Sequence, residues 1–201
     1  GINTDKEKQD DKDLFFDRTW AISKEHMSGI LFSLEETGDS PSSPLAQHVI
    51  RKKKFNEDLF IEPPEYTTIK QLFDGDKRGI VLTGRSGIGK SNVLSKIFLD
   101  LRRDNRYTLF LDARKIDTPY FLTYLENVVF KRIQNTYNVD AINALLNKQN
   151  KNLYIIVDAV NEYNQEGGPI ALLKNLIHFV NDPNVLKNVK IFISCRNELW
   201  E

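Results

Sequence analysis

The feature that most constrains this chain is an eight-residue motif that fits the pattern G-x-x-x-x-G-K-[S/T]. Glycines in such a motif permit backbone conformations that a Cβ would penalise, so that several N–H groups can point inward at phosphate oxygens. The positive end of the following helix adds to this attraction. The motif therefore predicts a phosphate-binding loop between a strand and a helix. Its members are Gly84, Arg85, Ser86, Gly87, Ile88, Gly89, Lys90 and Ser91.

Two side chains of this loop are expected to contact a nucleotide and its metal ion. Lys90 would reach the β- and γ-phosphates, and the hydroxyl of Ser91 would ligate Mg²⁺. A chance match in a chain of 201 residues has a probability below about 1% at average glycine content. Two other interpretations remain open: a glycine-rich turn before a helix, and a degenerate loop that binds no nucleotide.

Strand-like apolar runs alternate with helical periodicity from residue 66 onward. This alternation predicts an α/β fold with a mostly parallel sheet and helices on both faces. Together with the loop it indicates a P-loop NTPase, a three-layer α/β/α sandwich. Strands are expected at residues 79–83, 107–111, 153–157 and 189–194, and helices at 90–103, 121–133, 139–146 and 169–180.

Composition narrows the possible partners. The 28 Lys and Arg balance 28 Asp and Glu, so a broad electrostatic attraction to nucleic acid or anionic lipid is not expected. The short basic run at residues 51–54 is interpreted as a solvated face. The longest strongly apolar run, residues 153–157, is far short of the ~20 residues that a membrane span needs. We therefore expect no membrane partner and no strong nucleic-acid binding.

Cysteine and histidine usage indicates the compartment. The single cysteine, Cys195, excludes an intrachain disulfide and fits a reducing cytosol. The three histidines lie far apart, and with one cysteine they give no zinc-ligand spacing. Cys195 is expected to be a small buried residue and not a nucleophile, because no histidine lies near it in sequence. The N-terminal residues are polar and do not read as a signal peptide. A cytoplasmic location is expected.

A carboxylate ends the most apolar predicted strand. Asp158 follows residues 153–157, where a P-loop NTPase needs a residue that holds Mg²⁺. Glu162 comes four residues later and could orient and deprotonate the attacking water. A solvated loop acid is the alternative role for Glu162. Asn161 could orient water or cap a turn.

The last predicted strand ends in a basic residue. Arg196 follows residues 189–194 and Cys195. If this strand lies next to the strand that leads into the loop, Arg196 is placed to sense the γ-phosphate. A surface ion pair is the alternative role.

Three segments in this order resemble the NACHT-like branch of the STAND NTPases, the signal-transduction ATPases with numerous domains. They are GRSGIGKS at 84–91, LYIIVDAVNEY at 153–163 and KIFISCR at 190–196. The proline-containing segment at 59–66, LFIEPPEY, also resembles the family's lead-in to the loop. Many family members carry Asp where this chain has Asn161, which weakens the inference about hydrolysis rate more than the inference about binding.

The resemblance implies a P-loop NTPase fold of the ASCE type that binds ATP or ADP with Mg²⁺. It implies that Pro64 and Tyr66 lie near the adenine. It further implies a slowly ATP-hydrolysing switch that controls oligomerisation in a signalling or defence protein, against phages in bacteria, with a protein trigger sensed by a C-terminal region. The chain ends soon after Arg196, so we expect residues 51–201 to be an NTPase core truncated before the lid and winged-helix region.

Residues 1–50 are expected to be an N-terminal linker or arm, with residues 1–13 mobile and an amphipathic segment from residue 14. Three other functions remain open. A motor ATPase of the AAA+ or helicase kind would be stimulated by nucleic acid or protein. A degenerate P-loop scaffold would bind no nucleotide. A small-molecule kinase would need an arginine-rich lid.

Overall fold

Four parallel strands form the centre of the fold. The computed structural model describes residues 2–30, 55–182 and 185–200, so the expected domain boundary at residue 50 and the basic run at 51–54 lie outside the described residues. The strands are β1 (Gly79–Thr83), β2 (Tyr107–Asp112), β3 (Leu153–Asp158) and β4 (Val189–Cys195). Their order is β1-β4-β3-β2, and every neighbouring pair is parallel. The four expected strands are thus confirmed, and β4 lies beside β1.

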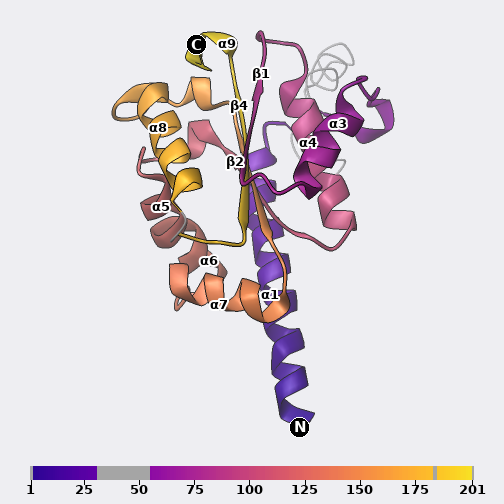
Figure 1. Ribbon diagram of the computed structural model, residues 1–201, viewed down its shortest axis with the longest axis vertical. Coiled ribbons are helices and arrows are strands. Elements are labelled where there is room, and N and C mark those ends of the chain that lie inside the picture. The colour runs from indigo at the N-terminus through magenta and orange to yellow at the C-terminus, as the bar shows by residue number, and fades with distance from the viewer. Residues whose placement is uncertain (1, 31–54, 183–184, 201) are drawn as a thin grey trace, which may run out of the picture.

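Helices cover both faces of this sheet (Figure 1). Alternate residues of each strand enter one of two apolar clusters: Ile155 and Val157 pack on one face, and Tyr154 and Ile156 on the other. Because both faces are buried, most residues of the strands are apolar, and the acids Asp112 and Asp158 stand at the ends of β2 and β3. The three-layer α/β/α sandwich is confirmed. One layer holds α3 (Tyr66–Asp74) and α4 (Lys90–Arg103); the other holds α5 (Phe121–Tyr124), α6 (Lys131–Ile133), α7 (Val139–Gln149) and α8 (Gly168–Asn181).

The helix expected at residues 121–133 is present but is not α-helical throughout. Between α5 and α6 the chain forms a π-helical segment, η3 (Leu125–Phe130). Val129 and Phe130 of this segment are in the core, where they are 1% and 0% exposed. A strict 3.6-residue period does not predict such a segment.

The N-terminal helix α1 (Ile2–Met27) lies along the outer edge of β2 and extends past the lower end of the sheet (Figure 1). The hydroxyl of Ser23 accepts the Phe110 N–H at 2.9 Å, and Nδ1 of His26 accepts the Asp112 N–H at 3.0 Å. Residues 2–13, expected to be mobile, continue this helix, since extending a formed helix costs far less than nucleating one.

Polar contacts hold α1 to both helical layers. Arg102 of α4 donates to the Phe16 carbonyl at 2.8 Å and lies over the Phe16 ring at 3.4 Å. On the other side, Arg132 of α6 forms an ion pair with Glu25 at 2.6 Å. The C-terminal part of α1, from Phe16 to His26, is therefore packed against the sandwich.

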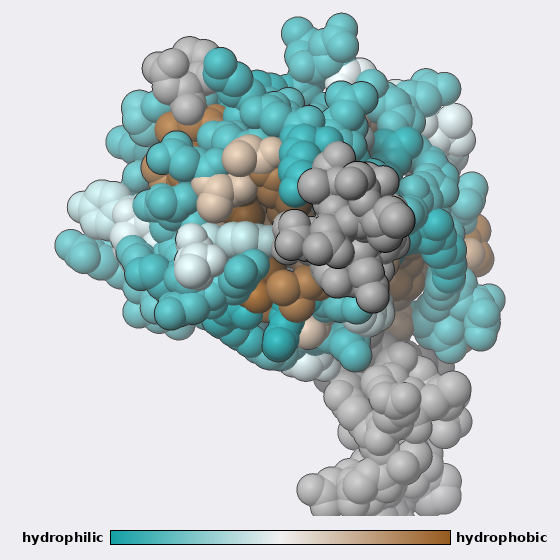
Figure 2. Space-filling model, turned by 90° about the horizontal axis from the view of Figure 1, so that it is seen from below, coloured by the Kyte–Doolittle hydropathy of each residue, from teal (hydrophilic) through white to brown (hydrophobic). Residues whose placement is uncertain are grey.

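The end of the molecule opposite the strand carboxyl ends presents mostly hydrophilic residues, with hydrophobic ones in a few small groups (Figure 2). Among the helices of the described residues, none combines the length and the apolar character that crossing a membrane requires.

Candidate functional site

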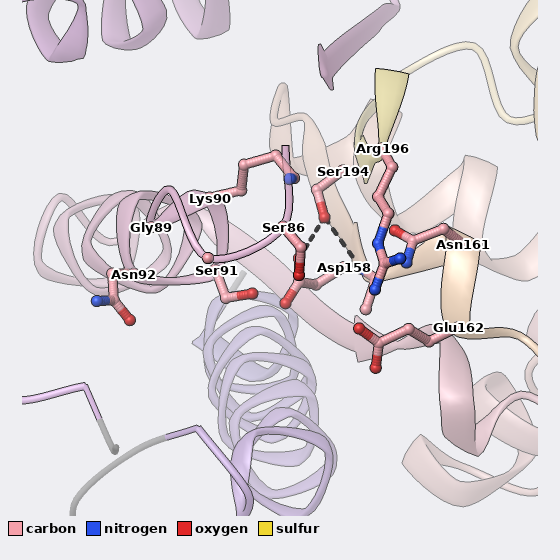
Figure 3. A pocket seen from close by; sticks show the side chains of 12 residues that line it. Ser86, Gly89, Lys90, Ser91, Asn92, Asp158, Asn161, Glu162, Ser194 and Arg196 are labelled. Carbon is pink, nitrogen blue, oxygen red and sulfur yellow. Dashed lines mark hydrogen bonds between the residues drawn. The ribbon is translucent and has the colours of Figure 1, made fainter. Parts of the chain in front are cut away.

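The predicted loop and the carboxyl ends of β3 and β4 meet around one cavity (Figure 3). Because all strands are parallel, every carboxyl end lies at the same edge of the sheet, and β4 between β1 and β3 brings its last residues beside the loop. The cavity has a volume of about 250 Å³. It is lined by Ser86, Gly87, Gly89, Lys90, Ser91, Asn92, Asp158, Ala159, Asn161, Glu162, Ser194 and Arg196.

Two glycines give the loop its shape. Gly87 and Gly89 have φ angles of 81° and 91°, which residues with a Cβ rarely adopt. A Cβ built on either would meet no atom within 4 Å, so the space beside the backbone is open to the cavity. Gly89 also precedes the first turn of α4, whose free N–H groups lie at this end of the helix. The loop thus forms a cradle for an anion.

Lys90 closes the loop on itself. Its ammonium donates to the carbonyl of Gly84 at 2.6 Å and to that of Arg85 at 2.9 Å. Both acceptors belong to the loop, so the charge lies against the cradle. Gly84, Arg85 and Ile88 do not line the cavity, although they belong to the motif.

Asp158 is the buried acid of the site. It is 2% exposed at the end of β3. The hydroxyl of Ser194 on β4 donates to its carboxylate and accepts the Ala159 N–H at 3.0 Å. Ala159 has a φ angle of 60°, and this bond holds that turn. The carboxylate therefore has a fixed direction beside Ser91 (Figure 3).

Glu162 ends the short helix η4 (Val160–Glu162) and reaches the same cavity. Its carboxylate lies 3.5 Å from the guanidinium of Arg114. That guanidinium is held by Asp112, with Nη2–Oδ2 at 2.7 Å and Nε–Oδ1 at 2.9 Å. Asp112 and Asp158 are paired in the register of β2 and β3, and Arg114 connects the end of β2 to Glu162.

Arg196 directly follows β4 and lines the cavity with an exposed side chain. Its neighbour Cys195 is fully buried, as expected. Burial raises the pKa of the Cys195 thiol above its ordinary value, although nearby Lys90 acts in the opposite direction.

A second cavity, of about 400 Å³, lies next to the first and shares Gly89 and Asn92 with it. Its lining is mostly apolar and aromatic: Phe55, Asn56, Leu59, Phe60, Ile61, Pro63, Ile88, Gly89, Asn92 and Val93. The expected contacts Pro64 and Tyr66 are not part of this lining. Pro64 is exposed, whereas Tyr66 is 4% exposed behind Phe60, with its ring centroid 5.7 Å from that of Phe60.

These residues fit a nucleotide with Mg²⁺. The open cradle and the charges of Lys90 and Arg196 suit phosphate oxygens. The hydroxyl of Ser91 and the carboxylate of Asp158 are the oxygen ligands that Mg²⁺ prefers. The adjoining aromatic cavity offers flat surfaces to a base.

Sequence reasoning did not assign Ser194, Arg114 and Phe55 to the site. Ser194 is a hydroxyl within an apolar strand, which is a signal that it bonds to another buried polar group. Arg114 reaches the site because β2 pairs with β3, and Phe55 reaches it because the lead-in segment passes beside the loop. No local sequence pattern predicts either position.

The profile of the NACHT domain family matches residues 78–201 of this chain. No relative is found among curated proteins.

Solved structures with a similar chain path include two from Aeropyrum pernix. The ORC1 protein, solved in complex with DNA, is 16% identical over 68% of this chain and 40% of its own, with a TM-score of 0.43. The ORC2 protein, solved as ADPNP–ADP complexes, is 17% identical over 71% and 44%, with a TM-score of 0.41. PCH-2 of C. elegans is 17% identical over 91% and 41%, with a TM-score of 0.36. This chain spans less than half the length of each.

Proposed function

This chain belongs to the NACHT domain family of STAND-class P-loop NTPases, and from that we propose that it is an ATP-binding and slowly ATP-hydrolysing switch module. Membership of this family supports nucleotide binding by the P-loop. The identity of the nucleotide, the hydrolysis and the switch are our proposal.

One observation carries the proposal. Lys90, Ser91, Asp158, Glu162 and Arg196 come from separate segments, and all five line one cavity at the carboxyl edge of the sheet. A turn that merely precedes a helix would not require an acid at the end of β3 and an arginine directly after β4 to lie beside it.

Each residue has a role that its position supports. Lys90 would leave the carbonyls of Gly84 and Arg85 for the β- and γ-phosphates. Ser91 and Asp158 would hold Mg²⁺, whose charge neutralises the phosphate oxygens when it is bound.

Two further residues would act on the reaction itself. Glu162 lines the cavity and would orient and deprotonate a water. Arg196 lines the same cavity and would contact the γ-phosphate, and would thereby distinguish ATP from ADP. Because Arg114 also contacts Glu162, the acid is partly engaged, which suits a slow reaction.

The second cavity supports a nucleoside as the ligand and not a simple phosphate. The rings of Phe55 and Phe60 lie 5.7 Å apart by their centroids, and a base can pack against such a wall. Since the sequence carries no Asn-Lys-x-Asp guanine-reading motif, we propose ATP as the nucleotide.

The biological setting we propose is a signalling or defence protein of the cytoplasm, with antiphage defence as the role in bacteria. ATP binding would order the elements around the γ-phosphate and expose surfaces for self-association. A protein trigger would control this self-association. Family membership supports this setting.

Calorimetric titration with ATP and with GTP, each with Mg²⁺, tests the proposal. We expect ATP to bind, and Lys90→Ala to weaken binding at least about tenfold because a charge-assisted contact to phosphate is lost. The exposed Lys174 on α8 provides the control, and Lys174→Ala should bind ATP as the wild type does. Equal binding of ATP by wild type and Lys90→Ala would exclude the P-loop assignment. Absence of binding would favour an interaction scaffold.

A further inference from the structure

The aromatic wall of the second cavity is attached to α4 by a network of charged side chains. We call residues 55–66 the base wall, since Phe55, Phe60 and Pro63 of this segment line the cavity. Glu57, in the short helix η1 (Glu57–Leu59), is bound by Arg103 of α4 through two N–O contacts of 2.5 Å. Lys96 of α4 lies 3.3 Å from the same carboxylate.

A second attachment lies at the other end of the base wall. The hydroxyl of Tyr66 donates to Asp100 of α4 at 2.7 Å, and Asp100 also accepts from Lys96 at 2.5 Å. Burial acts to raise the pKa of Asp100, but the hydrogen bonds from Lys96 and Tyr66 outweigh it and hold the pKa below its ordinary value. Lys96 thus joins the two attachments into one network.

The centre of the network is partly shielded from solvent. The side chains of Lys96 and Asp100 are 16% and 14% exposed and that of Glu57 is 27% exposed, whereas that of Arg103 is 57% exposed. The pair of Lys96 and Asp100 is therefore less screened by salt than a pair on an open surface. A fixed geometry is therefore expected for this part of the base wall.

Aromatic contacts connect Tyr66 to the residues that line the cavity. Its ring meets Phe60 edge-on, with centroids 5.7 Å apart, and Phe60 meets Phe55 in the same way at 5.7 Å. Tyr66 does not touch the cavity itself, but the two rings in front of it form the cavity's wall. A shift of Tyr66 would move Phe60.

The helix α4 also begins with Lys90 and Ser91 of the phosphate cradle. One helix thus holds the cradle at its first turn and the base wall at its second to fourth turns. We propose that Glu57, Lys96, Asp100 and Tyr66 are positioning residues that fix the base wall relative to the phosphate cradle and so set the affinity for the nucleoside part of the ligand. This inference rests on the function proposed above.

Comparison of ATP with inorganic tripolyphosphate, each with Mg²⁺, separates this role from general stabilisation. Tripolyphosphate engages the cradle alone, whereas ATP engages both the cradle and the base wall. In Tyr66→Phe we expect the Kd for ATP to rise about three- to tenfold, the effect of losing one typical hydrogen bond. The Kd for tripolyphosphate should stay within about twofold, inside the spread of a surface substitution.

A matched control and a second variant complete the experiment. Tyr120→Phe removes the same hydroxyl from a residue that is 59% exposed and outside the network, and it should bind both ligands as the wild type does. Glu57→Gln disrupts the other attachment and should repeat the selective loss for ATP. Thermal unfolding of each variant reports whether it is folded.

The outcomes are distinct. Selective loss for ATP in a folded variant supports the inference. Unchanged ATP affinity would overturn it, because the network would then have no role in binding. Equal weakening of both ligands, or failure of both variants to fold, would also overturn it, because the network would then only stabilise the fold. If wild type binds neither ligand, the proposed function itself fails; if wild type binds ATP and only the selective loss is missing, the proposed function stands and this inference does not.

Discussion

The hydroxyl of Ser194 is hydrogen-bonded to two consecutive residues at the end of β3: it donates to the carboxylate of Asp158 and accepts the N–H of Ala159. One oxygen on β4 thus fixes the direction of the acid that we propose for the metal ion. A hydrogen bond of this kind orients a metal ligand, and its loss typically costs about 10- to 100-fold in metal affinity.

Substitution Ser194→Ala should therefore weaken the response to Mg²⁺. We expect the Mg²⁺ concentration that half-saturates ATP binding to rise about tenfold, the lower end of the range for such supporting groups. Titration of Mg²⁺ at fixed ATP measures it. Ser95→Ala is the matched control, because Ser95 is buried in α4 and its hydroxyl has no hydrogen-bond partner in the described residues. An unchanged Mg²⁺ response in Ser194→Ala would count against this role.

Replacement of Glu162 by Gln should separate binding from hydrolysis. The amide keeps the shape of the side chain but cannot accept a proton, so turnover should fall about 10²-fold or more. The Kd for ATP should change by less than about twofold, as for a surface substitution. Phosphate release and calorimetry measure the two quantities. Glu166→Gln, an exposed acid of the same loop, is the control. Full turnover in Glu162→Gln would show that Glu162 is not the base.

The stability of the fold should fall in mild acid because of His26. Burial lowers its pKa to about 4; nearby Lys115 and Arg132 act in the same direction, and Asp112 opposes them. Its other ring nitrogen lies 3.3 Å from the hydroxyl of Tyr124. Since the unfolded state binds a proton near pH 6.5 and the folded state only near pH 4, stability is full above pH 6.5 and is lost as pH falls toward 4.

Between pH 7 and pH 5 this linkage corresponds to a loss of about 2 kcal/mol in the free energy of unfolding. Urea unfolding at the two pH values measures it. In His26→Gln the group no longer titrates, so the pH dependence over this interval should flatten even if the variant is less stable overall. An equally steep dependence in that variant would assign the effect to other groups.

The strands and the main helix of the site could be predicted because each follows from a local signal. Residues 153–157 form an unbroken apolar run, as a strand buried on both faces requires, and Gly89 with Lys90 marks the start of α4. The roles of Lys90, Asp158 and Glu162 remain predictions, although the structure brings all three to one cavity.

Other features depend on contacts between distant segments and could not be predicted in this way. The face of α1 toward β2 includes Ser23 and His26, and polar residues at these positions obscure the apolar periodicity of a helix that packs on a sheet edge. Tyr66 was expected beside the adenine, but Asp100, 34 residues later, draws its hydroxyl toward α4. Such a bond has no signature in the sequence around either residue.

The cover that α1 places on β2 determines where the sheet can grow. A strand can join a sheet only where N–H and C=O groups remain available, and on β2 the N–H groups of Phe110 and Asp112 are already taken by side chains of α1. At the opposite flank, no strand borders β1 in the described part of the chain. Any additional strand, from this polypeptide or another, would lengthen the sheet beside β1. The added strand would then lie beside β1, which leads directly into the phosphate cradle. The pairing of that strand and the binding of a nucleotide would therefore both involve β1.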